Sequence, residues 1–213
     1  GFEKPLVEHF KGKEGAKLIL NSMVDLPANG GETLPACLME VNWSNWEEYL
    51  KSLRSHYRYR IKKAREKWQQ VEIELETSQD FDTRCYQLYE GVFNRSEAKL
   101  EKLTLEFFQG LPLPSVLLKA KFKGQLLGFV QLVDNGSELI FLFIGFDHKL
   151  NRTFDIYFNL LLEIVAFAIK KGYKTIDLGQ TAEETKLKLG SRLLRKGMYL
   201  SHSRGFLDSL ANS

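Results

Sequence analysis

The stretch "YFNLLLEIVAFAIKKGYKTIDLG", from Tyr157 to Gly179, decides the fold. Its first part is apolar on nearly every side, which predicts a buried helix from about Phe154 to Lys171 that ends at Gly172. The apolar run "KTIDLG" follows directly and predicts a buried strand. An equally apolar strand, "SELIFLFIGF", precedes the helix. The pattern therefore predicts a right-handed crossover that joins two parallel strands.

Further strands surround this crossover. "SVLLKAKF", "QLLGFVQLV" and "SELIFLFIGF" are joined by turns at "KG" and "DNG", and the second of these turns is a strong hairpin signal. "VEIELETS" alternates apolar and acidic residues, as a strand wet on one face does. Helices are expected at residues 80–95, 98–110 and 182–189, and "KGMYLSH" is expected to form a last strand. The order predicts an α+β domain with a mixed, mostly antiparallel central sheet flanked by helices, whose core starts near residue 70.

Composition excludes several classes of protein. The 213 residues are 44% apolar and 27% charged, as in an ordinary globular protein, and the net charge of +3 is mild. Cys37 and Cys85 lie far apart in no metal-type spacing, so we expect no disulfide framework, no metal and a cytoplasmic setting. The most apolar run contains Glu163 and is too short to span a bilayer, so we expect no integral membrane protein.

The basic residues are concentrated in one segment. Ser44 and Glu47 have the spacing of a capping box, and residues 44–69 read as one long amphipathic helix. Between residues 51 and 67 there are eight Lys and Arg against one Glu. The candidate nucleic-acid-binding residues are Arg54, Arg58, Arg60, Lys62, Lys63 and Arg65. The helix is either simply solvated, a landing surface for tRNA or another polyanion, or a contact for an acidic membrane surface. Residues 1–43 finish this domain or belong to a preceding one, and residues 70–213 form the main domain.

The turn in "YKTIDLGQTAEETKLKLG", residues 173–190, has an acidic helix start. Thr181 and Glu184 have capping-box spacing, and Glu183 adds a second acid in the first turn. Carboxylates there would satisfy the free amides and offset the helix dipole, so we expect no phosphate at this turn. Either the turn is a plain helix start, or it places Asp177, Gly179 and Gln180 beside a cleft. Lys186 either pairs with Glu183 or has a functional role.

A second loop is the better candidate for binding phosphate. His148, Lys149 and Arg152 stand at the amino end of the apolar helix, where free amides and the helix dipole favour anions. Asp147 and Asp155 oppose this interpretation. The alternative is a solvated polar loop.

Three stretches resemble a known family. "LRSHYRYRIKKARE", "YFNLLLEIVAFAIKKGYKTIDLG" and "DLGQTAEETKLKLG" are similar to the GNAT acyltransferase fold, and most similar to its BioF2-like branch, which is related to the Fem peptidyltransferases. The chain departs from GNAT enzymes that bind coenzyme A through a Gln/Arg-x-x-Gly-x-Gly/Ala loop. Here the corresponding segment, "FDHKLNRTFDIYF", has no glycine. Fem-type relatives imply aminoacyl-tRNA as the donor instead.

The resemblance implies an N-acyltransferase that moves an acyl or aminoacyl group from acyl-CoA or aminoacyl-tRNA to a small-molecule or peptide amine by direct attack. Asp177 and His148 are equal candidates for the general base, Tyr157 for a proton donor, and Lys186 for a further catalytic role. Tyr157 is alternatively a core residue. The candidate donor-binding residues are Phe143, Ile144, Gly145, Phe146, Lys149, Asn151, Arg152, Thr153, Gly179 and Gln180. A second hypothesis is a catalytically silent GNAT-like module that binds a nucleotide or a polyanion such as RNA.

Overall fold

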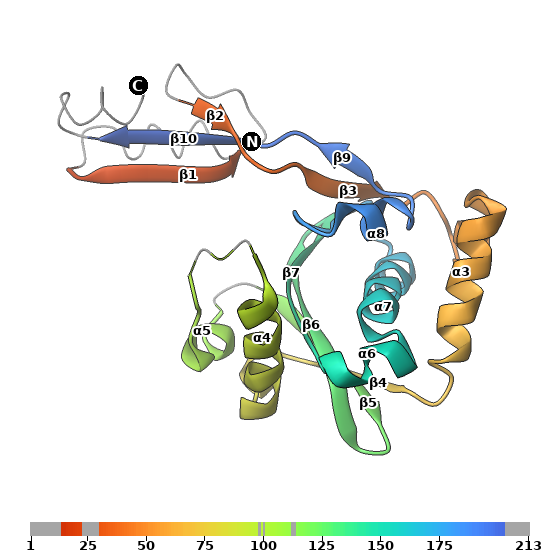
Figure 1. Ribbon diagram of the computed structural model, residues 1–213. Helices are drawn as coiled ribbons and strands as arrows, with labels where there is room; N and C mark the ends of the chain where they lie inside the picture. Colours follow the sequence, from red (N-terminus) through yellow and green to blue (C-terminus); the bar gives the residue numbers. More distant parts are fainter. Residues whose placement is uncertain (1–13, 23–29, 98, 100, 112–113, 203–213) are drawn as a thin grey trace.

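The computed structural model describes residues 14–22, 30–97, 99, 101–111 and 114–202. Figure 1 shows a curved central sheet with helices on both faces and a smaller sheet that extends to one side. The predicted α+β class and the mixed sheet are confirmed.

Seven strands form the central sheet, in the order β4-β5-β6-β7-β8-β3-β9. Their bounds are β4 Glu72–Glu76, β5 Ser115–Phe122, β6 Gln125–Asn135, β7 Glu138–Phe146, β8 Thr175–Asp177, β3 Ala36–Glu40 and β9 Arg192–Leu194. Strands β7 and β8 pair parallel, and the other neighbouring pairs are antiparallel. The predicted crossover is therefore confirmed, and the helix between β7 and β8 is its connection.

That connecting helix is α7, Ile156–Lys171, which is buried on almost every side. It lies between the sheet and helix α3, Ser55–Glu66 (Figure 1), and this position explains why its sequence has no polar face. Gly172 ends it in the left-handed conformation with φ 77°, which is the expected role of a glycine there.

The other face of the sheet is covered by α4, Thr83–Arg95, and α5, Leu105–Gln109 (Figure 1). Phe81 and Phe108 stack beneath them with ring centroids 4.5 Å apart and form a second apolar cluster with Phe129. The helix expected at residues 98–110 begins only at Leu105, where the Thr104 side chain caps it. The single-turn helix η1, Ser78–Asp80, precedes α4.

The prediction of one helix over residues 44–69 is wrong. Helix α2, Trp46–Ser52, and α3 are separate, because the chain is extended at Leu53, whose side chain is buried in the core. The cap of α2 is Asn45 rather than Ser44, and its side chain accepts a hydrogen bond from the Glu48 amide.

The core also begins well before residue 70. Strand β3 is inserted between β8 and β9 in the central sheet. Tyr49 of α2 is fully buried in the same apolar cluster as α7, and its hydroxyl donates to the Leu189 carbonyl at 3.0 Å. The segments on both sides of residue 70 therefore share one core.

The last strand, β10, Gly197–His202, does not join the central sheet. It lies between β1, Ala16–Ser22, and β2, Gly30–Glu32, in a three-stranded sheet that projects from the body of the molecule in Figure 1. Two further short helices complete the described fold: α6, His148–Phe154, just before α7, and α8, Glu183–Leu187, after β8.

Candidate functional site: a cleft where the central sheet opens

The central sheet opens between β7 and β8. The two strands pair from Glu138 and Thr175 only as far as Ile140 and Asp177. Strand β7 continues to Phe146, whereas the chain after Asp177 turns away. The β7 edge beyond Ile140 therefore faces no β8 residue, and its backbone amides and carbonyls are available to an extended ligand.

A β-bulge lies at the start of this opening. Leu132 and Gln131 of β6 pair with Phe141 and Phe143 of β7, which leaves Leu142 unopposed. The bulge breaks the alternation of side chains, so Phe141 packs against the α7 side of the sheet and Phe143 against the α4 side. The Leu142 side chain is 37% exposed, an unusual value for a leucine in the middle of a sheet.

The opening forms a cleft of about 590 Å³, a volume within the usual range of ligand sites. Helix α4, strand β7, the residues after β8 and helix α8 contribute most of the residues that line it. Of the predicted site residues, those that line it are Phe143, Ile144, Phe146, His148, Tyr157, Gly179, Gln180 and Lys186. Those that do not are Gly145, Lys149, Asn151, Arg152, Thr153 and Asp177.

Lys186 is the buried cation of the cleft, with a residue exposure of 2%. Its Nζ donates to the Gln180 carbonyl at 2.7 Å and to the Gly179 carbonyl at 3.4 Å. Pairing with Glu183 was one of the two alternatives for Lys186. Its ammonium forms its hydrogen bonds with these carbonyls and not with the Glu183 carboxylate. Burial lowers the pKa of Lys186 to about 8, although Cys37, Asp177 and Glu183 act in the opposite direction.

Asp177 holds the turn that supplies those carbonyls. Its Oδ1 accepts from the Gly179 amide at 2.7 Å, and its Oδ2 lies 3.5 Å from the Lys196 ammonium. Thr181 and Ala182 follow in the left-handed region, with φ 63° and 48°, a strained conformation for both. The predicted capping box is wrong, because Ala182 is the N-cap of α8 and no side chain caps the helix.

Gln180 connects the same turn to the smaller sheet. Its Nε2 donates to Asn21 Oδ1 at 2.8 Å and also to the Leu34 carbonyl. Its own carbonyl accepts from Lys186. The side chain and the backbone of one residue thus link β1, the segment before β3 and the buried lysine.

His148, the first residue of α6, lines the cleft and carries one unsatisfied ring nitrogen. Its Nε2 is buried and has no hydrogen-bond partner among the described residues. Burial, and next the charge of Arg95, lower the pKa of His148 below its ordinary value, with Asp147 opposing. The imidazole is therefore neutral at pH 7 and able to accept a proton.

The helix starts expected to bind phosphate are already occupied by side chains. Asp147 Oδ1 accepts from the amides of Lys149 and Leu150, at 2.9 and 3.3 Å. Asn151 Oδ1 accepts from the Tyr157 amide at 3.0 Å, which caps the start of α7. Side chains of this chain therefore take the hydrogen bonds that a phosphate would need.

Tyr157 is a lining residue of two clefts. The second cleft has a volume of about 450 Å³ and is also lined by Asn151, Asp155 and residues of α3 and α8. Burial raises the pKa of Tyr157 to about 12, so its hydroxyl remains a neutral donor at physiological pH.

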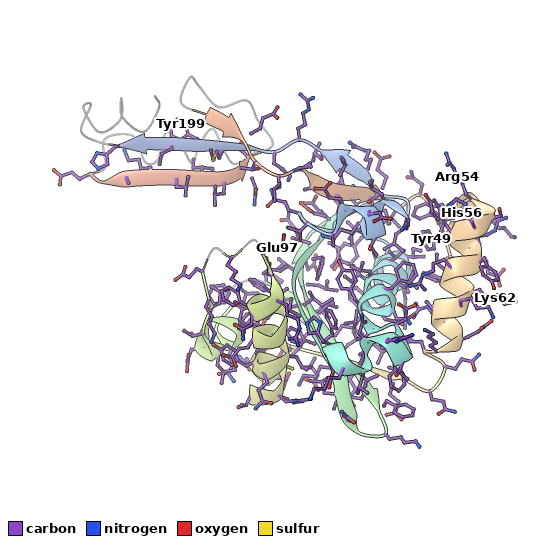
Figure 2. All side chains as sticks on the ribbon, in the orientation of Figure 1. Tyr49, Arg54, His56, Lys62, Glu97 and Tyr199 are labelled. Carbon is purple, nitrogen blue, oxygen red and sulfur yellow. The ribbon has the colours of Figure 1, made fainter. Side chains whose placement is uncertain are left out.

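Two arginines of the basic helix attach α3 to α7. Arg60 binds Asp155 through two nitrogens, one at 2.9 Å, and Arg65 binds Glu163. Arg58 donates to the Leu53 carbonyl, and Lys63 pairs with Glu66 at 2.7 Å. The side chains of Arg54 and Lys62 have no hydrogen bond or ion pair within the described part of the chain, and Figure 2 shows both pointing away from the body of the molecule.

Sequence reasoning missed the α4 wall of the cleft. Tyr89, Val92 and Phe93 line it, together with Arg95 and Ser96 from the end of the same helix. The signal was present, because residues i, i+3 and i+4 on one helical face are all apolar here. Such a stripe normally indicates core packing, and only the opening of the sheet exposes it to a cleft.

Comparison with known proteins identifies the family. A model of the acetyltransferase (GNAT) domain matches residues 51–187, more than half of the chain. The protein belongs to the GNAT family. Its fold is that of an acyltransferase family, as the three stretches of sequence implied. No curated protein sequence matches the chain at a significant level.

Solved structures agree on the fold. FemX is 11% identical with a TM-score of 0.68, and the alignment covers 98% of this chain and 71% of FemX. The structure of L-PGS from Bacillus licheniformis is 11% identical with a TM-score of 0.58, covering 99% and 70%. The C-terminal DUF2156 domain of an Agrobacterium fabrum protein is 10% identical with a TM-score of 0.57, covering 86% and 64%. The chain thus spans about two thirds of the length of each of these structures.

None of the described helices has the length and apolar character needed to cross a membrane. Within the same residues, no three His, Cys, Asp or Glu side chains converge as metal ligands.

Proposed function

We propose that the protein is an N-acyltransferase that moves an acyl or aminoacyl group from an activated ester or thioester to an amine in the cleft between β7 and the 178–182 turn. The observation that carries this proposal is that a buried ammonium, Lys186, and a neutral imidazole, His148, both line one cleft. Membership of the GNAT family supports acyl transfer as the type of reaction.

Lys186 would stabilise the developing oxyanion. With a pKa of about 8 the amine is mostly protonated at pH 7, and an ammonium has three N–H donors. Two of them point to the Gln180 and Gly179 carbonyls, which leaves the third for the carbonyl oxygen of the donor. Fixed hydrogen-bond donors of this kind stabilise a tetrahedral intermediate because they are already oriented.

His148 would manage the proton. The amine nitrogen attacks the carbonyl carbon of the donor, the C=O π pair moves to oxygen, and Nε2 of His148 takes the proton from the resulting ammonium. When the intermediate collapses, the bond to the leaving sulfur or oxygen breaks. The leaving atom then receives a proton from the imidazolium, or from Tyr157 on the same wall. Asp177 would act as a positioning residue, because its carboxylate holds the Gly179 amide.

The phosphates of the donor would rely on side chains rather than on helix amides. Asp147 and Asn151 occupy the amides at the starts of α6 and α7. The exposed Lys149 and Arg152 lie in the same region and supply cationic groups to either acyl-CoA or aminoacyl-tRNA. This arrangement favours neither donor, and an assay has to include both.

The test is a transfer assay with both donor classes. The protein is incubated with a set of acyl-CoAs and, separately, with a charged-tRNA pool, each with a mixture of small amines and amine-bearing peptides, and amide products are detected by mass spectrometry. Amide formation that depends on the protein is the expected result. No amide product from either donor class would overturn the proposal.

A binding module without catalysis is the second candidate, and the outward-pointing Arg54 and Lys62 favour it. Clustered unpaired cations are what phosphate neutralisation needs. A protein that retains RNA in a salt-dependent way but forms no amide would be this module. Measuring amide formation and RNA retention on one preparation of protein therefore distinguishes the two candidate functions.

A further inference from the structure

Aromatic side chains of α4 and β7 form one wall of the cleft. The rings of Phe93 and Tyr89 lie 5.9 Å apart, those of Tyr89 and Phe143 lie 6.4 Å apart, and those of Phe143 and Phe107 lie 6.0 Å apart. The first three rings line the cleft, and Phe107 on α5 is 42% exposed. One wall of the cleft is therefore largely aromatic. Arg95 and Ser96 line the same wall, and the Lys99 ammonium lies 5.9 Å from the centroid of the Phe93 ring.

Leu142 adds an exposed apolar side chain to the same cleft. The bulge leaves it without a partner on β6, and it is 37% exposed although its neighbours are packed against one apolar cluster or the other. An apolar side chain held in water by a bulge contributes little to folding. It would be covered if an apolar ligand filled the cleft.

The polar groups of the cleft belong to different segments. Lys186 lies beside the Phe141 ring, with its Nζ 5.7 Å from the centroid, and His148 lies against Phe146, with the ring centroids 4.3 Å apart. The described contacts place neither of them against Phe93 or Phe107. A ligand whose carbonyl meets Lys186 would therefore direct the remainder of its acyl chain along the rings of this wall.

We propose that the group transferred carries a long or bulky apolar chain, which lies along Phe93, Tyr89 and Phe143. An acetyl or glycyl group would be too short to cover these rings and would leave them exposed to water. The proposal rests on the proposed function for the position of the carbonyl, and it names the substrate class of that site. Burial of apolar surface strengthens binding by roughly fourfold per methylene where burial is complete.

The experiment measures binding separately from transfer. Acetyl, butyryl, hexanoyl and octanoyl thioesters of N-acetylcysteamine carry no nucleotide and can be titrated calorimetrically without any amine. We expect the dissociation constant to fall steadily with chain length, by at least about 50-fold from acetyl to octanoyl, because the open cleft buries each methylene only in part. Equal affinities for acetyl and octanoyl, or no measurable binding of octanoyl, would overturn the proposal.

Two variants make the result specific to the cleft. Leu142→Asp places a charge beside the apolar chain at an already exposed position, and it should remove most of the chain-length dependence. Leu75→Asp is the matched control, because Leu75 is 52% exposed on β4 and is not part of this cleft. Chain-length dependence that survives in Leu142→Asp would overturn the proposal.

The same compounds distinguish failure of this inference from failure of the proposed function. Chain-dependent binding with no amide formed on addition of amines would contradict acyl transfer and leave the apolar site standing. Transfer of acetyl and octanoyl groups with equal kcat/KM would support acyl transfer and contradict the apolar site.

Discussion

Replacement of Lys186 by methionine should change how stability depends on pH. In the unfolded chain the lysine titrates at its ordinary pKa of 10.5, and in the folded protein it titrates at about 8. Below pH 8 both states carry the charge, and folding has to remove it from water. Between pH 8 and 10.5 the unfolded chain keeps the proton that the folded protein has lost, so the free energy of unfolding rises with pH.

The size of the effect follows from these two pKa values. Between pH 7 and pH 9.5 the contribution of Lys186 to the free energy of unfolding should become more favourable by about 2 kcal/mol. Burial raises the pKa of Tyr157 and of Cys85 to about 12, and both groups act in the opposite direction at high pH. Wild type and Lys186→Met share these two groups, so their contributions cancel in the difference. The pKa of Cys37, which burial raises and Lys186 lowers, rises further in the variant, and this change also makes the difference increase with pH.

The assay is urea denaturation of both proteins at intervals of half a pH unit. The matched control is Lys188→Met, because the Lys188 side chain is 41% exposed and its ammonium remains in water. The wild-type minus Lys186→Met difference should rise with pH, whereas the wild-type minus Lys188→Met difference should stay flat. Two flat differences would refute the burial of Lys186 and, with it, the geometry on which the proposed oxyanion site depends.

Three further predictions concern the surroundings of the cleft. Gly145→Ala should lower the free energy of unfolding by about 3 kcal/mol, measured in urea, because its Cβ would lie 2.3 Å from Cε1 of Phe129; an unchanged midpoint would contradict the close packing. Gln180→Ala should lower kcat of the transfer about 10-fold with KM nearly unchanged, since it frees the turn that orients the lysine; a change in KM alone would contradict this role. Arg60→Ala should lower the free energy of unfolding by about 1 kcal/mol without altering retention on heparin. Lys62→Ala should weaken retention on heparin and leave the free energy of unfolding unchanged; identical effects of the two substitutions would contradict a structural role for Arg60 and a binding role for Lys62.

The part of the fold that the sequence predicts is the part with strong local signals. Helix α7 is apolar on all sides and ends at Gly172. The hairpin turns contain residues typical of such turns, as in the turn at Lys123 and Gly124, which both have positive φ. Strands β3 and β9 were missed because they are short and are held by pairing with distant segments. The β7 bulge was invisible because its strand is apolar at almost every position, so there was no alternation to break.

The sequence singled out several residues that line the cleft, but not the geometry that brings them together. Lys186 was singled out, but its spacing from Glu183 suggested a surface ion pair, whereas a strained turn directs two backbone carbonyls at it. His148 was placed in a phosphate loop, but the Asp147 side chain takes the amides there. Such features depend on backbone conformation, which residue types alone do not specify. The α4 wall was missed because a cleft and a core both require an apolar stripe.

The measurement that tests acyl transfer in this cleft most directly is the rate of amide formation by wild type, Lys186→Met and Lys188→Met with the best donor and amine at pH 7.5. Loss of one oriented oxyanion donor costs roughly 10²- to 10³-fold in rate. We predict a loss of at least about 100-fold for Lys186→Met and nearly wild-type rates for Lys188→Met. Equal rates for all three proteins would contradict the proposed site.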